Sequence, residues 1–124
     1  MKILAILAFL LTVVINQAKP QDLKPANKTE RRVVQMIKNL PEIIDNNKYM
    51  TKKGRPFVTY IENKPGGSDN YYHVTVSENN GSQLVPHFRF LVNAKTYRIY
   101  YVDFWNDNFK PIPLSVWRKR KGSK

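Results

Sequence analysis

Hydrophobic and polar positions alternate along three segments in the second half of the chain. These segments are residues 71–78, 87–93 and 97–103. Side chains of a β-strand point to opposite faces in turn, so each segment is predicted to be a strand with one apolar face. Residues 57–62 are rich in β-branched and aromatic side chains, and they predict a fourth strand.

The register of these strands follows from keeping their apolar faces on one side of the sheet. Asn79, Asn80 and Gly81 mark the turn between the first two alternating strands. We expect an odd number of loop residues there, because a slip of one residue reverses the faces of a strand. In the next turn, a two-residue loop of Ala94 and Lys95 is predicted. The pairs that follow from this loop are Val92 with Tyr97, Phe90 with Ile99, and Phe88 with Tyr101.

A helical period precedes the strands. The apolar residues on one predicted helical face are Val33, Ile37, Leu40 and Ile44. The helix is expected to start near Thr29 or Glu30. Pro41 lacks an N–H group and clashes with the preceding turn. We therefore expect either a kink at Leu40 or two short helices, with Pro41 in the first turn of the second.

One helical segment before four strands predicts an α+β fold, with a kinked N-terminal helix packed on a four-stranded antiparallel meander. The single domain is expected to span residues 29–117. Residues 114–117 are expected to close the core as a short strand or a turn of helix. Residues 19–28 are predicted to be a flexible lead-in, and residues 118–124 a disordered basic tail.

The N-terminus has the pattern of a secretory signal peptide. A charged start at Lys2 precedes an apolar run over residues 3–15, and Ala18 suits the position before a cleavage site. The run is short for a membrane span, which takes about 20 residues. We therefore predict a signal peptide over residues 1–18 and a secreted or periplasmic protein with no transmembrane span after cleavage. An uncleaved N-terminal anchor is the alternative.

The charge of the chain is strongly positive. Its 21 Lys and Arg residues against 9 Asp and Glu residues give a formal net charge of +12. Such a surface attracts anions, so the predicted partners are an anionic polymer, a membrane surface or an acidic protein. Solubility alone is an alternative explanation of the charge. The chain has no cysteine, so its stability must come from packing without disulfides.

Catalytic and metal chemistry have little support in the sequence. There is no cysteine nucleophile and no GxSxG motif, and the acids form no clear carboxylate pair. Two histidines are too few for a zinc site, which takes three or four ligands. We expect no enzymatic activity, no metal site and no cofactor.

The outward face of the sheet and the basic tail are the predicted binding surfaces. In the predicted register, His73 lies opposite Arg89 and His87 lies opposite Thr75. Aromatic and arginine side chains on an open sheet can stack on an extended anionic ligand or anchor a protein partner. A ladder of side chains that only stabilises the sheet is the alternative for the outward face. The predicted binding residues are His73, His87, Arg89, Arg98, Tyr100, Arg118, Lys119, Arg120 and Lys121.

The predicted order of a helix followed by an antiparallel meander resembles the cystatin-like group of folds and small exported domains of the PepSY type. Gln83 and Val85 are similar to the QxVxG motif of cystatin protease inhibitors, and Trp117 is similar to the tryptophan near their C-terminus. Residues 71–118 also resemble a family of small secreted proteins of Bacteroidetes-type bacteria, which implies no particular activity. The expected function is an exported, non-enzymatic binding module. The cystatin resemblance implies an alternative, a protease inhibitor that acts through its hairpin loops around residues 83–86.

Overall fold

The computed structural model of the chain describes residues 23–103 and 110–122. The predicted signal peptide, residues 1–18, lies outside the described residues. None of the helices in the described part of the chain is long and apolar enough to cross a membrane. The elements, in order, are α2 (Lys28–Lys38), α3 (Pro41–Lys52), β1 (Phe57–Asn63), β2 (Tyr71–Asn79), β3 (Leu84–Asn93), β4 (Ile99–Val102), β5 (Pro111–Pro113) and α4 (Leu114–Gly122).

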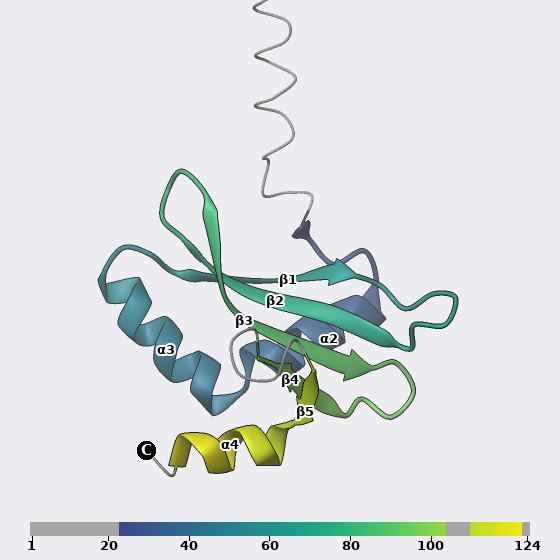
Figure 1. Ribbon diagram of the computed structural model, residues 1–124. Helices are drawn as coiled ribbons and strands as arrows, with labels where there is room; N and C mark the ends of the chain where they lie inside the picture. Colours follow the sequence, from purple (N-terminus) through teal and green to yellow (C-terminus); the bar gives the residue numbers. More distant parts are fainter. Residues whose placement is uncertain (1–22, 104–109, 123–124) are drawn as a thin grey trace, which may run out of the picture.

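The fold is α+β, with one antiparallel sheet in the order β1-β2-β3-β4-β5 (Figure 1). The predicted count of four strands is wrong, because β5 pairs with β4 and adds a fifth. Pro111 and Pro113 occupy two of the three positions of β5. Proline is confined to edge strands and strand ends, because it cannot donate to a ladder. The two prolines of β5 are therefore the reason that the sequence did not predict this strand.

The helical segment is two helices, which is the second of the two predicted arrangements. Leu40 has an extended backbone and is the N-cap of α3, and Pro41 stands in the first turn of α3. Because the extended residue restarts the helix, the apolar period of α2 does not continue through it. Ile43 is 2% exposed, whereas Ile44 is 41% exposed, so the prediction of an inward Ile44 is wrong.

The N-terminus of α2 is closed by a reciprocal set of hydrogen bonds. Asn27 is the N-cap, and its Oδ1 accepts from the backbone N–H of Glu30 at 2.9 Å. The Glu30 carboxylate in turn accepts from the N–H of Ala26 at 3.0 Å, and the Lys64 ammonium lies 3.1 Å from it. These contacts satisfy N–H groups that a helix start leaves unpaired. The last residues of the predicted flexible lead-in, 19–28, are therefore held to α2.

A β-bulge sets the register between β2 and β3. The ladder pairs Asn79 with Leu84, Ser77 with Pro86, and Val76 with Phe88. The loop is thus residues 80–83, an even number, and the prediction of an odd loop is wrong. His87 is the extra residue of the bulge, and it supplies the single-residue shift that the loop does not. Phe88 therefore still faces the core.

The β3–β4 hairpin is offset by two residues from the predicted register. Phe90 pairs with Tyr101 and Val92 pairs with Ile99, so the predicted two-residue loop is wrong. An offset of two positions keeps each side chain on the same face, because the period of a strand is two residues. The Asn93 side chain organises the longer turn by accepting hydrogen bonds from two backbone N–H groups of the loop.

The core lies between the sheet and the three helices, and α4 is part of it. Trp117 is 6% exposed, and its ring stacks on Tyr101 with centroids 4.5 Å apart. Phe88 and Phe90 meet the same ring edge-on. The predicted disordered tail is therefore wrong for residues 118–122, which continue α4 (Figure 1). Burial of one aromatic ring orders a segment whose composition alone indicates disorder.

Candidate functional site

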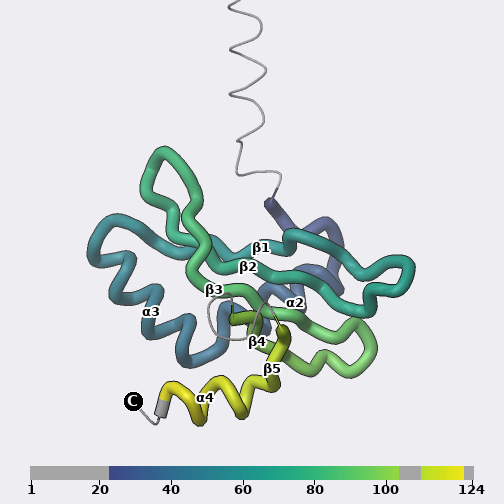
Figure 2. The backbone as a smooth tube through the Cα atoms, viewed as in Figure 1, coloured from purple at the N-terminus to yellow at the C-terminus, as the bar shows by residue number. Residues whose placement is uncertain are grey.

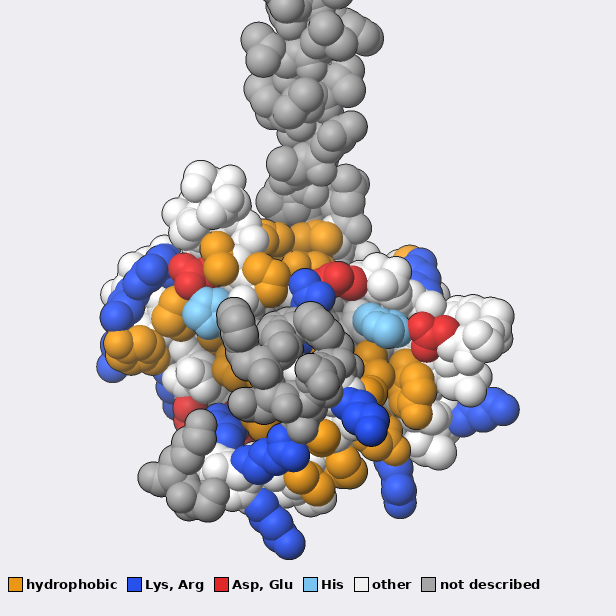
Figure 3. Space-filling view, viewed as in Figure 1, with side chains coloured by type: hydrophobic (Ala, Val, Ile, Leu, Met, Phe, Trp, Pro, Cys, Tyr) orange, Lys and Arg blue, Asp and Glu red, His pale blue; other side chains and the backbone are white. Residues whose placement is uncertain are grey.

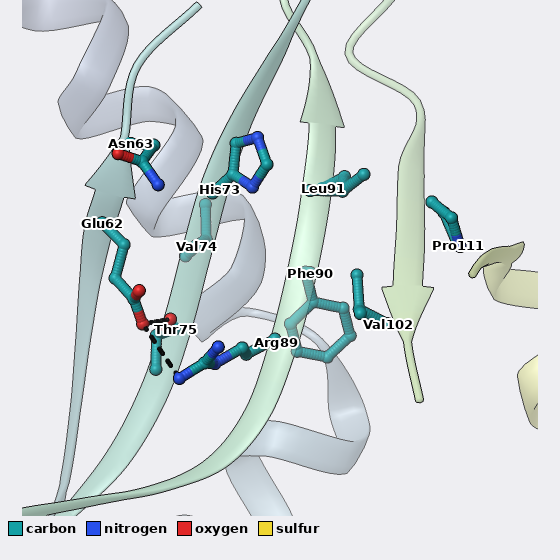
Figure 4. A pocket seen from close by; sticks show the side chains of 10 residues that line it. All are labelled: Glu62, Asn63, His73, Val74, Thr75, Arg89, Phe90, Leu91, Val102 and Pro111. Carbon is teal, nitrogen blue, oxygen red and sulfur yellow. Dashed lines mark hydrogen bonds and ion pairs between the residues drawn. The ribbon is translucent and has the colours of Figure 1, made fainter. Parts of the chain in front are cut away.

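The outward face of the sheet carries the predicted residues His73 and Arg89, but in a different register. The prediction of an outward His87 is wrong, because this bulge residue lies against Glu78 and Phe57, which have the core-facing parity of Val76. His73 pairs with Leu91 rather than with Arg89, and Thr75 pairs with Arg89 rather than with His87. The two histidines, pale blue in Figure 3, lie on the same face of the molecule. Over the sheet lies a hollow of about 370 Å³, lined by residues of β1, β2, β3, β4 and β5 (Figure 4).

Each of these three basic side chains contacts a carboxylate. The contacts are His73 Nε2 to Asp69 Oδ2 at 2.7 Å, His87 Nε2 to Glu78 Oε1 at 2.6 Å, and Arg89 Nη2 to Glu62 Oε1 at 3.6 Å. The acids lie at strand ends and turns, and none of them was among the predicted binding residues. Because a carboxylate lies beside each of them, these residues attract anions less than their basic side chains alone would suggest.

Glu62 reaches the hollow because the β1 ladder is irregular at its position. The register shifts between Ile61 and Asn63, which leaves Glu62 out of the pairing. The Thr75 hydroxyl, 1% exposed, donates a hydrogen bond to the Glu62 carboxylate, and Arg89 approaches the same carboxylate (Figure 4). The group is a carboxylate held by a hydroxyl and a guanidinium.

Glu78 and Asp69 hold the two histidines in different surroundings. Glu78 is buried, and Arg55 lies 3.5 Å from its second oxygen while His87 contacts the first. Asp69 also accepts the backbone N–H of Tyr71. This hydrogen bond, followed by the one from His73, lowers the pKa of Asp69. Within the described residues, no group of three His, Cys, Asp or Glu side chains lies close enough to hold a metal ion.

Arg98 and Tyr100 lie beside the start of α4, and Leu91 stands between Tyr100 and His73 in the sheet. Both line an open hollow of about 450 Å³ between β4, β5 and Leu114. Arg98 is exposed, and no acid in the described part of the chain forms an ion pair with it. The ring of Tyr100 meets Tyr71 edge-on at 5.8 Å. These two predicted residues are thus available for contact in a way that the carboxylate-paired group is not.

The predicted tail residues sit on a helix anchored at two points. Arg118 donates to both oxygens of Glu42 of α3, at 2.7 and 3.1 Å, and Trp117 is in the core. Arg118 is therefore a structural contact between α3 and α4. Lys119, Arg120 and Lys121 are exposed, and the Lys121 ammonium lies 4.7 Å from the centre of the Trp117 ring.

The Glu42–Arg118 contact predicts loss of stability in acid. Hydrogen bonding from Arg118 is the main cause that lowers the pKa of Glu42. A carboxyl whose pKa is lowered by folding stabilises the protein above its unfolded pKa, about 4.3 for Glu, and this contribution is lost as pH falls through the folded pKa. We expect urea unfolding of Glu42→Gln to show less change between pH 6 and pH 3 than the unchanged chain. An equal change in both proteins would contradict this role.

No sequence signal pointed to the Glu42–Arg118 pair, because its members are 76 residues apart. The other missed acids had weak signals. Asp69 is four residues before His73. Glu62 is two residues after Tyr60 in β1, so the period of a strand predicts that both side chains point to the outward face. The signal for Glu62 is not sufficient without the register, because its position in β1 does not show which side chain it meets across the sheet.

Comparisons of the chain with protein-family models, with curated proteins and with solved structures find no match. The resemblance to cystatin-like and PepSY-type domains therefore stays a prediction. The structure is relevant to one part of the cystatin resemblance, the role of Trp117. Trp117 is buried among Phe88, Phe90 and Tyr101, so its ring is not exposed for contact with a protease.

Proposed function

We propose that the protein is an exported, non-enzymatic binding module that engages an anionic polymer through the cations of α4. The observation that carries the proposal is the way α4 is held. Trp117 and Arg118 fix the helix to the core and to α3, while Lys119 and Lys121 remain exposed. An ordered helix presents its charges with a smaller entropic cost of binding than a disordered tail would.

Arg98 and Tyr100 extend this surface at the other end of α4. Their hollow borders Leu114, the first residue of the helix. A guanidinium beside an aromatic ring suits an anionic ligand with flat or apolar parts. The hollow that contains Arg89 and His73 is proposed as a secondary contact, where shape and hydrogen bonds contribute more than charge because a carboxylate lies beside each of the two side chains.

The test is binding of heparin, a sulfated polysaccharide, over a series of salt concentrations. We expect the double variant Lys119→Gln/Lys121→Gln to bind more weakly at low salt. The slope of log K against log salt should fall in magnitude by about two, because two cations no longer release counterions. The matched control Lys48→Gln/Lys52→Gln removes the same charge from exposed positions of α3 and should bind more tightly than the α4 variant.

Equal weakening by both variants would show attraction by net charge alone and would overturn the role of α4. Absence of heparin binding by the unchanged chain at low salt would overturn the polymer as partner. The same preparations can be assayed against papain. Inhibition of papain that is lost on substitution of Gln83 and Val85 would instead support the protease-inhibitor alternative.

A further inference from the structure

The two edges of the sheet differ in their ability to pair with another strand (Figure 2). The β5 edge is three residues long and contains Pro111 and Pro113. Proline and short length are devices that protect an edge from pairing. The β1 edge, Phe57–Asn63, is seven residues long and contains no proline and no lysine. Only the β1 edge is therefore suited to accept a further strand.

The hydrogen bonds at the start of β1 show which backbone groups point outward. The Pro56 carbonyl accepts from the N–H of Asn79, so these residues are a hydrogen-bonded pair. Such pairs alternate along an antiparallel ladder, which turns the N–H and C=O groups of Phe57, Thr59 and Ile61 away from β2. Phe57 shows this direction directly, because its N–H donates outward to Oδ1 of Asn47 at 2.9 Å.

In the described part of the chain, Thr59 and Ile61 have no such partner. Among the described residues, the structure gives their outward N–H and C=O groups no hydrogen bond to another part of the chain. Each residue carries one donor and one acceptor that require water or a partner. The irregularity at Glu62 ends the regular edge after Ile61. The stretch of β1 whose outward backbone groups have no described partner therefore runs from Thr59 to Ile61.

A groove of about 260 Å³ runs beside Val58 and Thr59, and its far wall is α2. The α2 residues in this wall have the spacing i, i+3, i+4 and i+7, which places them on one side of the helix. They are Arg31, Val34, Gln35 and Lys38. Lys24 lines the groove as well, and no described acid does. The groove is therefore cationic along a free strand edge.

We propose that the β1 edge and this groove bind an extended acidic segment of a partner protein as a sixth strand. Backbone pairing at Thr59 and Ile61 would supply affinity, and Arg31, Lys38 and Lys24 would select acidic side chains. A second copy of this chain fits less well, because symmetric pairing would bring the same cations together. The site is separate from α4, so it does not depend on the proposed binding of an anionic polymer.

The probe is a labelled peptide, acetyl-Glu-Val-Glu-Val-Glu-Val-Glu-amide, titrated into the full chain at physiological salt. We expect saturable binding and slower hydrogen–deuterium exchange at Thr59 and Ile61. Two control peptides should bind at least tenfold more weakly. One has lysine at each glutamate position, and the other carries N-methyl groups on the backbone nitrogens of one edge, which removes the donors for pairing.

Variants of the chain locate the site. Arg31→Glu/Lys38→Glu should weaken peptide binding at least tenfold. The control Lys119→Glu/Lys121→Glu changes the net charge equally on α4 and should weaken it less than threefold. Thr59→Pro removes the outward N–H and should abolish binding, with circular dichroism used to check that the chain is folded.

Equal effects of the two charge variants, or protection from exchange only outside β1, would overturn the site. Self-association through β1 without peptide binding would assign the edge to a second copy and overturn the acidic segment as its occupant. Since heparin binding by Lys119→Gln/Lys121→Gln tests the proposed polymer site separately, failure of one proposal leaves the other open to a distinct result.

Discussion

Replacement of Trp117 by alanine is expected to lower the free energy of unfolding by about 3–5 kcal/mol, the usual cost of removing a large buried aromatic side chain. The Trp117 ring joins three others at the centre of the core, and it stacks on Tyr101. Aromatic pairs of this geometry contribute beyond their buried area. Loss of the ring should also loosen α4 and, with it, the contact between Arg118 and Glu42.

Urea unfolding followed by circular dichroism measures this change. Val116→Ala is the matched control, because Val116 is the preceding residue of α4 and is 37% exposed. Substitutions at exposed positions usually change stability by less than about 0.5 kcal/mol. Similar losses in the two variants would contradict the placement of Trp117 in the core and would favour the disordered tail that composition alone predicts.

Ile43→Ala is expected to cost about 2–5 kcal/mol of unfolding free energy, and Ile44→Ala much less. The two residues are adjacent in the sequence and chemically identical, so the pair isolates burial from helix propensity. Ile43 belongs to the core cluster, whereas Ile44 is exposed. The difference depends on the break at Leu40, which sets the rotation of α3 relative to α2.

The same unfolding experiment at neutral pH compares the two variants. A larger loss for Ile44→Ala would mean that the apolar period of α2 continues through Pro41 as one kinked helix. Equal losses would show that both side chains are buried. The measurement therefore tests the helix break itself, which the sequence left as one of two alternatives.

The candidate site was predictable in its residue types and much less in its arrangement. His73 and Arg89 were placed on the outward face from the period of their strands, and the structure keeps them there. Glu62, the carboxylate partner of Arg89, was missed because register decides which side chains meet across a sheet. One bulge at His87 changed that register without changing the faces.

The local pattern of residues indicated β1 to β4, the N-terminal helical segment and the core-facing side of the strands, because these depend on a period of two or 3.6 residues. The lack of an N–H group at Pro41 indicated either a kink or a break in the helical segment, and the structure shows the break, with Leu40 extended. Only the tertiary structure decided the strand register, the pairing of Glu42 with Arg118, and the order of α4 around Trp117. These features depend on contacts between residues far apart in the chain, which no local period encodes.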